Sequence, residues 1–397
     1  MPFTKCCFTM SVAVFLSITL NVSAIAYYPV GGVLFLTVPP STVADGMGQT
    51  HSPLNLNDSF QDYFFPGSSS GKQKTIAFGF MRDQLSQLGL SDISYNAAGF
   101  HGGRKFECCG DTSSLLTLGI YNINLILGDR AWIDEEGNSL GVIRNWVEGV
   151  VALRSGWKWN KGWNRRRLSH LTINAGLGFD IIRSSLYTGV TCGETDPTGW
   201  NIGLDWGLGA VARIYSSDSD RFNWDAGLQI AENFINRNGT FFADRAQAVP
   251  LPRQVHWSMA SAVEWHRQSL PLARIHLAAG RTVSLLDDDE EYKPVFSSLF
   301  DSGRSSLGLE FTGAGTLTLR CGIHVDGPAD LDMATLGWGL QSGCVTDYIT
   351  LLNGYQPGRF VTFLNKFNLF YNYSAGARGN YTRAETVNHE LGISLGY

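Results

Sequence analysis

The chain has 397 residues, of which 44% are hydrophobic, 12% aromatic and 16% charged, and its formal net charge is −5. This composition is too apolar for a disordered chain, and it lacks the basic excess of a nucleic-acid-binding protein. A mean hydropathy of −0.04 is too low for a bundle of membrane-spanning helices. With 45 glycines and few charges, the composition is typical of an all-β protein.

The first residues have the layout of a secretory signal peptide. Lys5 gives a positive start, and residues 8–20 form an apolar stretch that is shorter than the roughly 20 residues of a membrane-spanning helix. Small residues then precede a predicted cleavage site after Ala24. We therefore predict that residues 1–24 are a signal peptide and that the mature chain is exported.

The cysteines give no sign of a metal site or a disulfide framework. Five follow the predicted cleavage site, and no two of them have the C-x-x-C spacing of zinc ligands. Because five is odd, at least one thiol stays unpaired, and the sequence leaves the pairing open. The five are Cys108, Cys109, Cys192, Cys321 and Cys344.

The region over residues 25–112 differs from the rest of the chain. Prolines at 39, 40, 53 and 66 and the segment 67–71 (GSSSG) interrupt any regular pattern, and residues 82–90 could form a short helix. Weaker strand patterns occur at 30–38 and 75–81. Two interpretations stay open for the irregular part of this region, a plug in the lumen of a barrel or a long loop outside the membrane.

Residues 113–397 consist of segments in which apolar and small or polar residues alternate. Clear examples are 171–181, 204–214, 317–325 and 367–373. Segments of about ten residues exceed the usual five or six of soluble strands and match strands that cross a membrane. Counting them from about residue 115 gives eleven or twelve. With the weaker patterns at 30–38 and 75–81, the sequence predicts a transmembrane antiparallel β-barrel of about fourteen strands. The alternative is a soluble β-sandwich, whose strands would be shorter.

The end of the chain favours the barrel. Alternate residues from Val387 to Leu395 are apolar or aromatic, and the chain ends in Tyr397. Outer-membrane barrels characteristically close with a strand of this kind. We therefore expect Tyr397 to be recognised by the barrel assembly machinery, and the outward side chains to contact outer-membrane lipid.

Three charged or ionisable patterns have simple interpretations. The basic and tryptophan-rich stretch 154–167 is predicted to lie at the membrane interface, where a hairpin leaves the bilayer. The acidic run 287–291 lacks the spacing of a calcium loop. His256, His266 and His276 recur every ten residues, as neighbouring strands would place them, so we expect no metal ligands there.

Two motif-like sequences fail to support an enzyme. Residues 392–396 spell G-x-S-x-G, but a nucleophile elbow needs a helix after the serine. Residues 67–72 are one residue too short for a phosphate-binding loop. We predict no catalytic residues, no metal and no cofactor.

The segment 94–100 (SYNAAGF) resembles the Y-N-P-A-G-[LM] stretch of FadL-type outer-membrane transporters. Asn96, Ala98 and Gly99 match that stretch, Tyr95 fits its aromatic position, and Ala97 stands where the family has proline. The chain is similar to a divergent, spirochaete-like member of this superfamily. The resemblance implies a fourteen-stranded barrel, plugged by an amino-terminal hatch, that passes long-chain fatty acids and other hydrophobic molecules.

From this resemblance we predict a ligand-binding site formed by the matched residues and their neighbours, in which a nearby cation receives the carboxylate of a fatty acid. The predicted site residues are Asn96, Ala98, Gly99, Phe100, Arg104 and Lys105. Two other functions remain open, a general diffusion porin with a water-filled lumen and a surface barrel that acts as an adhesin or structural protein.

Overall fold

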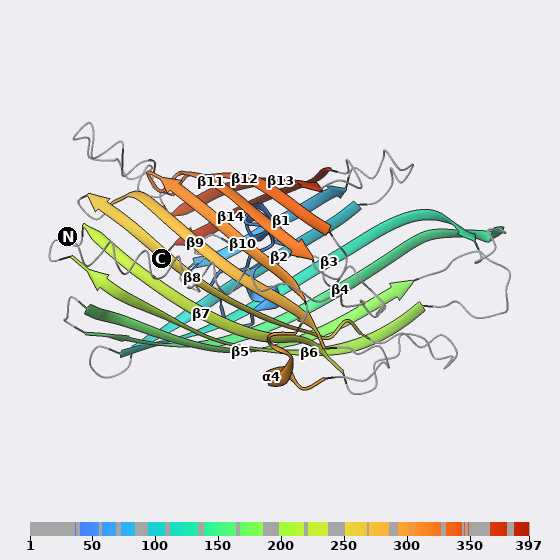
Figure 1. Cartoon of the computed structure of the whole chain (residues 1–397), viewed down its shortest axis with the longest axis horizontal. Coiled ribbons are helices and arrows are strands. Elements are labelled where there is room, and N and C mark those ends of the chain that lie inside the picture. Colours follow the sequence, from blue (N-terminus) through green and yellow to red (C-terminus); the bar gives the residue numbers. More distant parts are fainter. Residues whose placement is uncertain are drawn as a thin grey trace.

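In the computed structural model, the chain forms fourteen strands and three short helices within its described residues (Figure 1). The described residues are 36, 40–54, 58–68, 73–83, 94–107, 112–133, 139–163, 167–185, 198–217, 221–236, 251–267, 270–285, 293–301, 303–326, 331–343, 345, 348, 366–378 and 385–396. The helices are α2 (Thr42–Gly46), α3 (Gln61–Phe64) and α4 (Val295–Ser298). The strands are β1 (Gln73–Asp83), β2 (Ser94–Glu107), β3 (Thr112–Ile133), β4 (Ser139–Gly162), β5 (Arg167–Ser185), β6 (Thr198–Ser216), β7 (Phe222–Ile235), β8 (Gln254–Arg267), β9 (Leu270–Ser284), β10 (Arg304–Gly313), β11 (Leu317–Asp326), β12 (Leu331–Gln341), β13 (Phe367–Arg378) and β14 (Glu385–Gly396).

The strands form one closed antiparallel barrel. Each strand pairs with its neighbours in sequence, and β1 closes the ring by pairing with β14 from Gln73 opposite Gly396 to Asp83 opposite Thr386. Closure satisfies the hydrogen-bonding groups of every strand edge, which is the condition for a sheet to span lipid. The predicted fourteen-stranded barrel is confirmed. It closes without the weak strand pattern at 30–38, of which only Leu36 is described.

The predicted alternation is also confirmed. Along β5 and β6, Leu177 and Leu208 are 67% and 52% exposed on the outward face, whereas the inward Asp180 and Asp205 are buried. On β14, Leu391 is outward and its neighbour Glu390 is buried. An apolar outer face with a polar inner face is the arrangement of a membrane barrel, the reverse of a soluble protein.

Two local predictions differ from the structure. Several strands exceed ten residues, above all β3 and β4 with 22 and 24, which project well beyond the rest of the wall (Figure 1). Their outer halves contain shifts in register, as between Ile126 and Gly128. The short helix expected at 82–90 is wrong at its start, because Arg82 and Asp83 continue the β1 ladder with β14. The remainder of that prediction lies outside the described residues.

Candidate functional site: the barrel lumen

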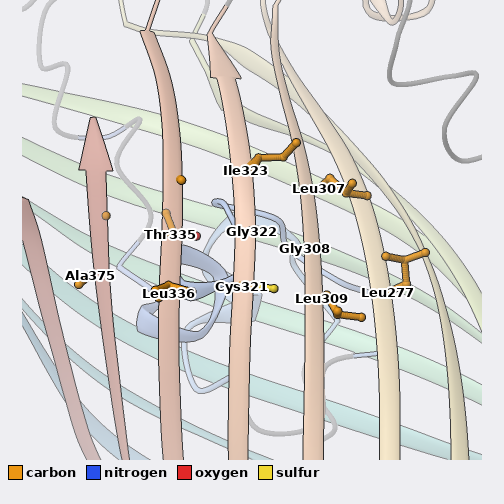
Figure 2. A pocket seen from close by; sticks show the side chains of 12 residues that line it. Leu277, Leu307, Gly308, Leu309, Cys321, Gly322, Ile323, Thr335, Leu336 and Ala375 are labelled. Atoms are coloured by element: carbon orange, nitrogen blue, oxygen red, sulfur yellow. The ribbon is translucent and has the colours of Figure 1, made fainter. Parts of the chain in front are cut away.

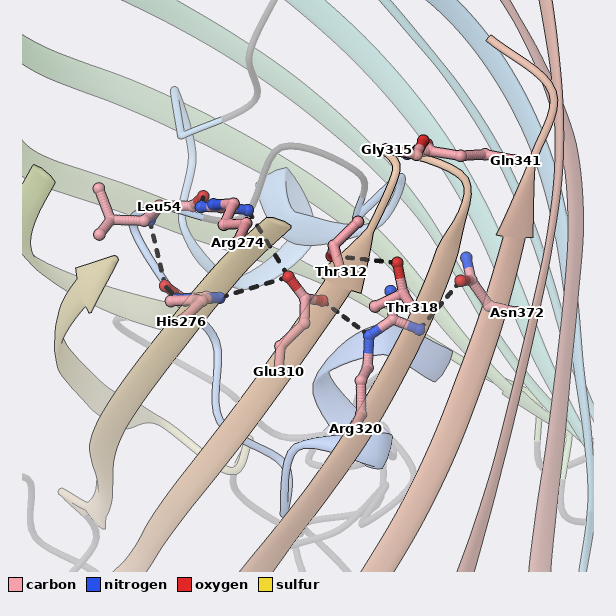
Figure 3. A network of polar contacts seen from close by, with 11 residues as sticks. Leu54, Arg274, His276, Glu310, Thr312, Gly315, Thr318, Arg320, Gln341 and Asn372 are labelled. Atoms are coloured by element: carbon pink, nitrogen blue, oxygen red, sulfur yellow. Dashed lines mark hydrogen bonds and ion pairs between the residues drawn. The ribbon is translucent and has the colours of Figure 1, made fainter. Parts of the chain in front are cut away.

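The lumen contains the segment that precedes the barrel. We call residues 40–54 and 58–68 the inner segment; it includes α2 and α3 and is buried almost throughout. It touches the wall on opposite sides, with α2 beside β11 to β14 and α3 beside β4 and β7. In Figures 1 and 3 it lies within the ring of strands. The inner segment therefore lies inside the barrel, and its role as a plug stays a prediction.

Glycines on the wall let the inner segment pack backbone against backbone. A Cβ on Gly322 would lie 2.2 Å from the nitrogen of Gly48, and one on Gly308 would lie 2.5 Å from the carbonyl oxygen of Met47. Gly48 itself has φ +68°, a conformation that glycine adopts without strain. Its amide donates a 2.8 Å hydrogen bond to the Thr335 hydroxyl. The wall is thus shaped to receive this segment.

A buried ion cluster fixes α3. The Arg154 guanidinium of β4 lies 2.8 Å from Asp180 and 2.6 Å from Asp205, and these three side chains are at most 1% exposed. The same guanidinium donates two hydrogen bonds, of 3.0 and 2.9 Å, to the carbonyl oxygen of Tyr63. Asp205 also accepts a 2.7 Å hydrogen bond from the amide of Phe234. These contacts compensate the burial of the charges and connect the inner segment to four strands, β4 to β7.

A second cluster lies on β9, β10 and β11 (Figure 3). Glu310 accepts a 2.8 Å hydrogen bond from Arg320 and lies 3.6 Å from Arg274 and 3.5 Å from His276. The other nitrogen of His276 lies 2.6 Å from the Ser52 hydroxyl of the inner segment. Glu310 therefore organises cations and an imidazole that reach the inner segment from one side of the barrel.

Further polar contacts hold each end of the inner segment. Near its start, one carboxylate oxygen of Asp45 accepts 2.7 Å hydrogen bonds from Ser374 on β13 and from Asn388 on β14. At its end, Lys158 donates to the carbonyl oxygen of Ser68 at 2.6 Å, and Asn174 donates to that of Gly67 at 3.2 Å. Together with the two clusters, these contacts fix the inner segment to strands all around the barrel.

The space between α3 and the wall is filled by aromatic rings. The Tyr63 ring lies 4.8 Å from Phe64, 6.5 Å from Tyr121 of β3 and 6.4 Å from Phe234 of β7, measured between centroids. Phe60 lies 5.9 Å from Tyr121. These distances suit edge-to-face and tilted ring packing. The interior therefore combines an apolar core with buried charges instead of a continuous polar surface.

Burial shifts two titratable groups of the inner segment in opposite senses. Desolvation lowers the pKa of His51 to about 3, so its imidazole is neutral near pH 7. Desolvation also raises the pKa of Asp58 to about 6, although hydrogen bonds from Ser41 and from the amide of Phe60 favour its charged form. Both groups make the seating of the inner segment dependent on pH.

A groove of about 680 Å³ lies on the other side of the wall (Figure 2). Outward side chains of β9 to β13 line it, including Leu309, Cys321 and Leu336, and its base includes Gly308 and Gly322. Because the lining side chains face outward, the groove opens toward lipid and not toward the lumen.

The structure places the predicted site residues along β2 but does not bring them together in a lumen pocket. Asn96 and Phe100 are exposed on the outward face, where Ala98 also points. Gly99 is inward, and a Cβ there would lie 2.8 Å from the Tyr121 ring and 3.1 Å from Phe60 of the inner segment. Gly99 thus serves the packing of the inner segment, and the ligand-binding role of this stretch stays a prediction.

The two predicted cations of β2 lie on opposite faces of the strand. Lys105 is opposite Leu115, which points inward and is buried, whereas Arg104 is opposite Leu116, which points outward. Both cations are exposed, and the Arg104 guanidinium lies 5.6 Å from the centre of the Phe106 ring. Of the two, Lys105 has the position from which a side chain can reach the lumen.

The expectation for the stretch 154–167 was wrong in part. Arg154 and Lys158 point inward and bind the inner segment, while Trp157 points outward between them. The strand continues to Gly162, so strict alternation separates the cations from the tryptophan. The same alternation, applied to the charged positions, would have identified the buried cluster that the sequence reasoning missed.

The prediction of neighbouring strands holds for two of the three histidines, because His266 lies on β8 together with His256. His256 lies on β8 and His276 on the neighbouring β9, and both are buried and inward. Among the described residues no group of three or more His, Cys, Asp or Glu side chains is arranged to hold a metal ion.

Several predictions lie outside the described residues. These are the signal peptide at 1–24, the acidic run 287–291, Tyr397, Cys108, Cys109, Cys192 and Cys344; Cys321 is a free thiol. No helix within the described ranges has the length and apolar character to span a membrane.

None of the protein-family models and none of the curated proteins matches the chain. Among solved structures, the chain is similar to the CymD monoaromatic hydrocarbon channel, with 10% identity over 90% of this chain and 97% of that one and a TM-score of 0.44. The Ralstonia pickettii toluene transporter TbuX has 11% identity, coverage of 90% and 98%, and a TM-score of 0.42. The Pseudomonas putida toluene transporter TodX has 9% identity, coverage of 94% and 99%, and a TM-score of 0.45. The fold assignment depends on the strand pairing of the chain itself, which gives the fourteen-stranded architecture that the FadL resemblance implies.

Proposed function

We propose that this chain is a FadL-type outer-membrane channel for the uptake of hydrophobic small molecules, with long-chain fatty acids as its leading substrate class. The observation that carries the proposal is the filled lumen. The inner segment packs an aromatic core against the wall and is held by the Arg154 and Glu310 clusters. The lumen thus combines an apolar core with polar groups held in fixed positions, and such a combination suits a hydrophobic ligand that leaves water.

The general porin is the weaker alternative. A diffusion pore needs a continuous water-filled lumen, whereas the strands of this barrel contact a segment buried within it. The adhesin alternative places function in the loops, and the buried charge clusters of the lumen would then have no role beyond stability. Neither alternative accounts for the fit between the wall glycines and the inner segment.

Two measurements on the full-length protein test the proposal. In a planar bilayer, the purified barrel should show little steady ionic current. In liposomes or in cells that lack other fatty-acid transporters, it should accelerate the entry of a labelled long-chain fatty acid. A large constant conductance would favour the porin, and a closed barrel that takes up no hydrophobic probe would overturn the proposal.

We further propose that Lys105 receives the carboxylate of a fatty acid. Lys105→Ala should weaken fatty-acid binding by about tenfold, the effect of losing one charge-assisted hydrogen bond. The matched control is Arg104→Ala, because Arg104 is the preceding residue and points to the outward face of the strand. Titration with a fluorescent fatty acid measures the affinity of each variant. If the double variant binds as the wild type does, neither cation has this role.

A further inference from the structure

The inner wall of β7 and β8 carries buried polar side chains in cross-strand register. Asn233 is opposite Gln254, Gln229 is opposite Ser258, and His256 lies between these pairs on β8. Each of the five is at most 4% exposed. We call Gln229, Asn233, Gln254, His256 and Ser258 the polar patch.

Six side-chain atoms of the polar patch have no hydrogen-bond partner within the described part of the chain. They are Gln229 Oε1, Asn233 Oδ1 and Nδ2, Gln254 Oε1, His256 Nε2 and Ser258 Oγ. A buried polar atom without a partner costs about 1–3 kcal/mol, and native proteins usually satisfy such atoms with protein, water or ligand. A set of six on two paired strands indicates a place that receives hydrogen-bonding groups from elsewhere.

Aromatic rings of the inner segment face this patch. The Phe64 ring lies 4.8 Å from the His256 ring and the Phe65 ring lies 6.0 Å from it, between centroids. His51 is 5.1 Å from Phe64, and its carbonyl oxygen accepts a 3.4 Å hydrogen bond from Gln229. The Nδ1 atom of His51 also has no hydrogen-bond partner among the residues that the structure describes. Polar atoms on the wall thus meet ring faces and edges on the inner segment.

We propose that the interface between the polar patch and the rings of His51, Phe64 and Phe65 is a binding site for an aromatic molecule that carries a hydroxyl group. This inference rests on the proposed channel function and names a second ligand class for the same lumen, at a site separate from Lys105, where we propose that fatty acids bind. The ligand ring takes the place of Phe64 beside His256, and its hydroxyl reaches the polar patch.

The chemistry of the unpaired atoms selects the hydroxyl. Three of the six, Gln229 Oε1, Asn233 Oδ1 and Gln254 Oε1, are amide oxygens, which only accept hydrogen bonds. A carboxylate has no hydrogen to give them, and a hydrocarbon leaves them unpaired. A phenolic hydroxyl donates to one of them and can accept from Asn233 Nδ2. The patch therefore discriminates between two ligands that differ by one hydroxyl.

Toluene and p-cresol are the probes, because p-cresol is toluene with one added hydroxyl. Binding of each to the purified full-length protein is measured by calorimetry or by displacement of a fluorescent probe. We expect the wild type to bind p-cresol more tightly, and Asn233→Leu to weaken p-cresol binding by about tenfold with no change for toluene. Thr312→Val is the control, a buried polar-to-apolar change on β10 whose hydroxyl pairs with Thr318 instead.

A second variant keeps the test independent of how Asn233→Leu folds. Phe64→Ala removes a ring beside His256, and a space of this kind can admit an aromatic molecule. We expect Phe64→Ala to bind p-cresol several-fold more tightly than the wild type does, with a smaller gain for toluene. Retained mobility of the unheated protein on SDS gels verifies that each variant is folded.

The outcomes separate this inference from the proposed function. If Asn233→Leu weakens the binding of toluene and p-cresol equally, or weakens neither, the polar patch does not recognise the hydroxyl and the inference is overturned. Uptake of hydrophobic probes by the wild type would still support the proposed channel. If Phe64→Ala increases the affinity for toluene and for p-cresol by the same factor, the inference is also overturned. If the wild type binds no hydrophobic molecule, including fatty acids, both this inference and the proposed channel function are overturned.

Discussion

At the scale of single residues, the lumen depends on buried charges that are compensated in place. Arg154 lies between Asp180 and Asp205 and also donates to the Tyr63 carbonyl oxygen, so one guanidinium serves two carboxylates and the inner segment. A buried charge is tolerated when its partners and hydrogen bonds are complete, and it is costly when a partner is removed. Such residues should therefore be sensitive to substitutions that keep their volume.

Arg154→Met should destabilise the protein by about 3–5 kcal/mol, because two buried carboxylates lose their cation. The measurement is the midpoint of urea unfolding followed by mobility on SDS gels. Arg213→Met is the control, since the pair of Arg213 with Asp225 is partly exposed and should contribute about 1 kcal/mol or less. Equal midpoints for the two variants would contradict a structural role for the buried cluster.

His51→Phe should make the inner segment more resistant to acid. The pKa of His51 is lowered to about 3, so a released segment takes up a proton below pH 6.5 that the seated segment does not. Acidification from pH 6.5 toward 3 therefore favours release in the wild type relative to the variant, by roughly 1.4 kcal/mol per pH unit. Asp58, whose pKa is raised to about 6, acts in the opposite sense in both proteins and cancels in the comparison.

Protease cleavage within the inner segment measures this release at pH 7.5 and pH 4.5. The two proteins should be cleaved alike at pH 7.5, and the wild type faster at pH 4.5. A difference that is equally large at both pH values would show that His51 acts through packing and not through its proton.

At the scale of elements, alternation along each strand decides what faces lipid and what faces the inner segment. The pattern predicted the outward Leu177 and Leu391, and the same parity puts Gly308 and Gly322 inward. These glycines have no side chain, so the backbone of Met47 and Gly48 approaches the wall directly. The strands of the wall thus form a surface that fits the inner segment, in addition to separating the lumen from lipid.

Gly322→Ala should displace the inner segment, because the new Cβ would lie 2.2 Å from the nitrogen of Gly48, where the backbone cannot yield cheaply. We expect a rise in steady conductance and a loss of stability of about 1–3 kcal/mol. Gly313→Ala on β10 is the matched control, since the nearest atom would be 3.6 Å from its Cβ. If neither variant shows a steady current in the bilayer, the close packing of Gly322 against the inner segment is not needed to keep the lumen closed.

At the scale of the whole molecule, the barrel and the inner segment are two parts with different roles. The ring of fourteen strands closes on itself through β1 and β14, without the inner segment as a partner in the ladder. The inner segment occupies the lumen of a barrel of this size, which would otherwise hold water. Removal of the segment should therefore leave the wall and open the lumen.

A chain that lacks residues 41–68 should still migrate as a folded barrel on SDS gels and should give a large, steady single-channel conductance. The full-length chain, measured in the same bilayers, is the control. Unchanged conductance would show that the inner segment does not close the lumen. Loss of heat-modifiable mobility would show instead that the barrel needs the segment to fold.

The sequence alone determined the strand periodicity, the outward faces and the approximate number of strands, because membrane strands alternate with a strict period of two and lipid demands apolar residues at every second position. It also singled out the region before the barrel, since prolines and glycines there break the period. It left open what Arg154 and Lys158 bind. Alternation places both on the inward face, but a cluster of cations and tryptophans is found both at a membrane interface and within a strand. The sequence also could not place Asn96 and Phe100 on the outward face, because a short motif does not show which side of a strand its residues occupy.

Only the tertiary structure decided which distant residues meet in the lumen. Closure of the barrel brings Asp45 to Asn388, and Ser52 to His276 and its partner Glu310, across hundreds of positions in the chain. These contacts depend on the register of every intervening strand pair, and a shift of one residue would exchange the inward and outward faces of a strand. Where a strand alternates clearly, the local pattern fixes the face of each residue, and the accumulated register of the closed sheet fixes which distant residue it contacts.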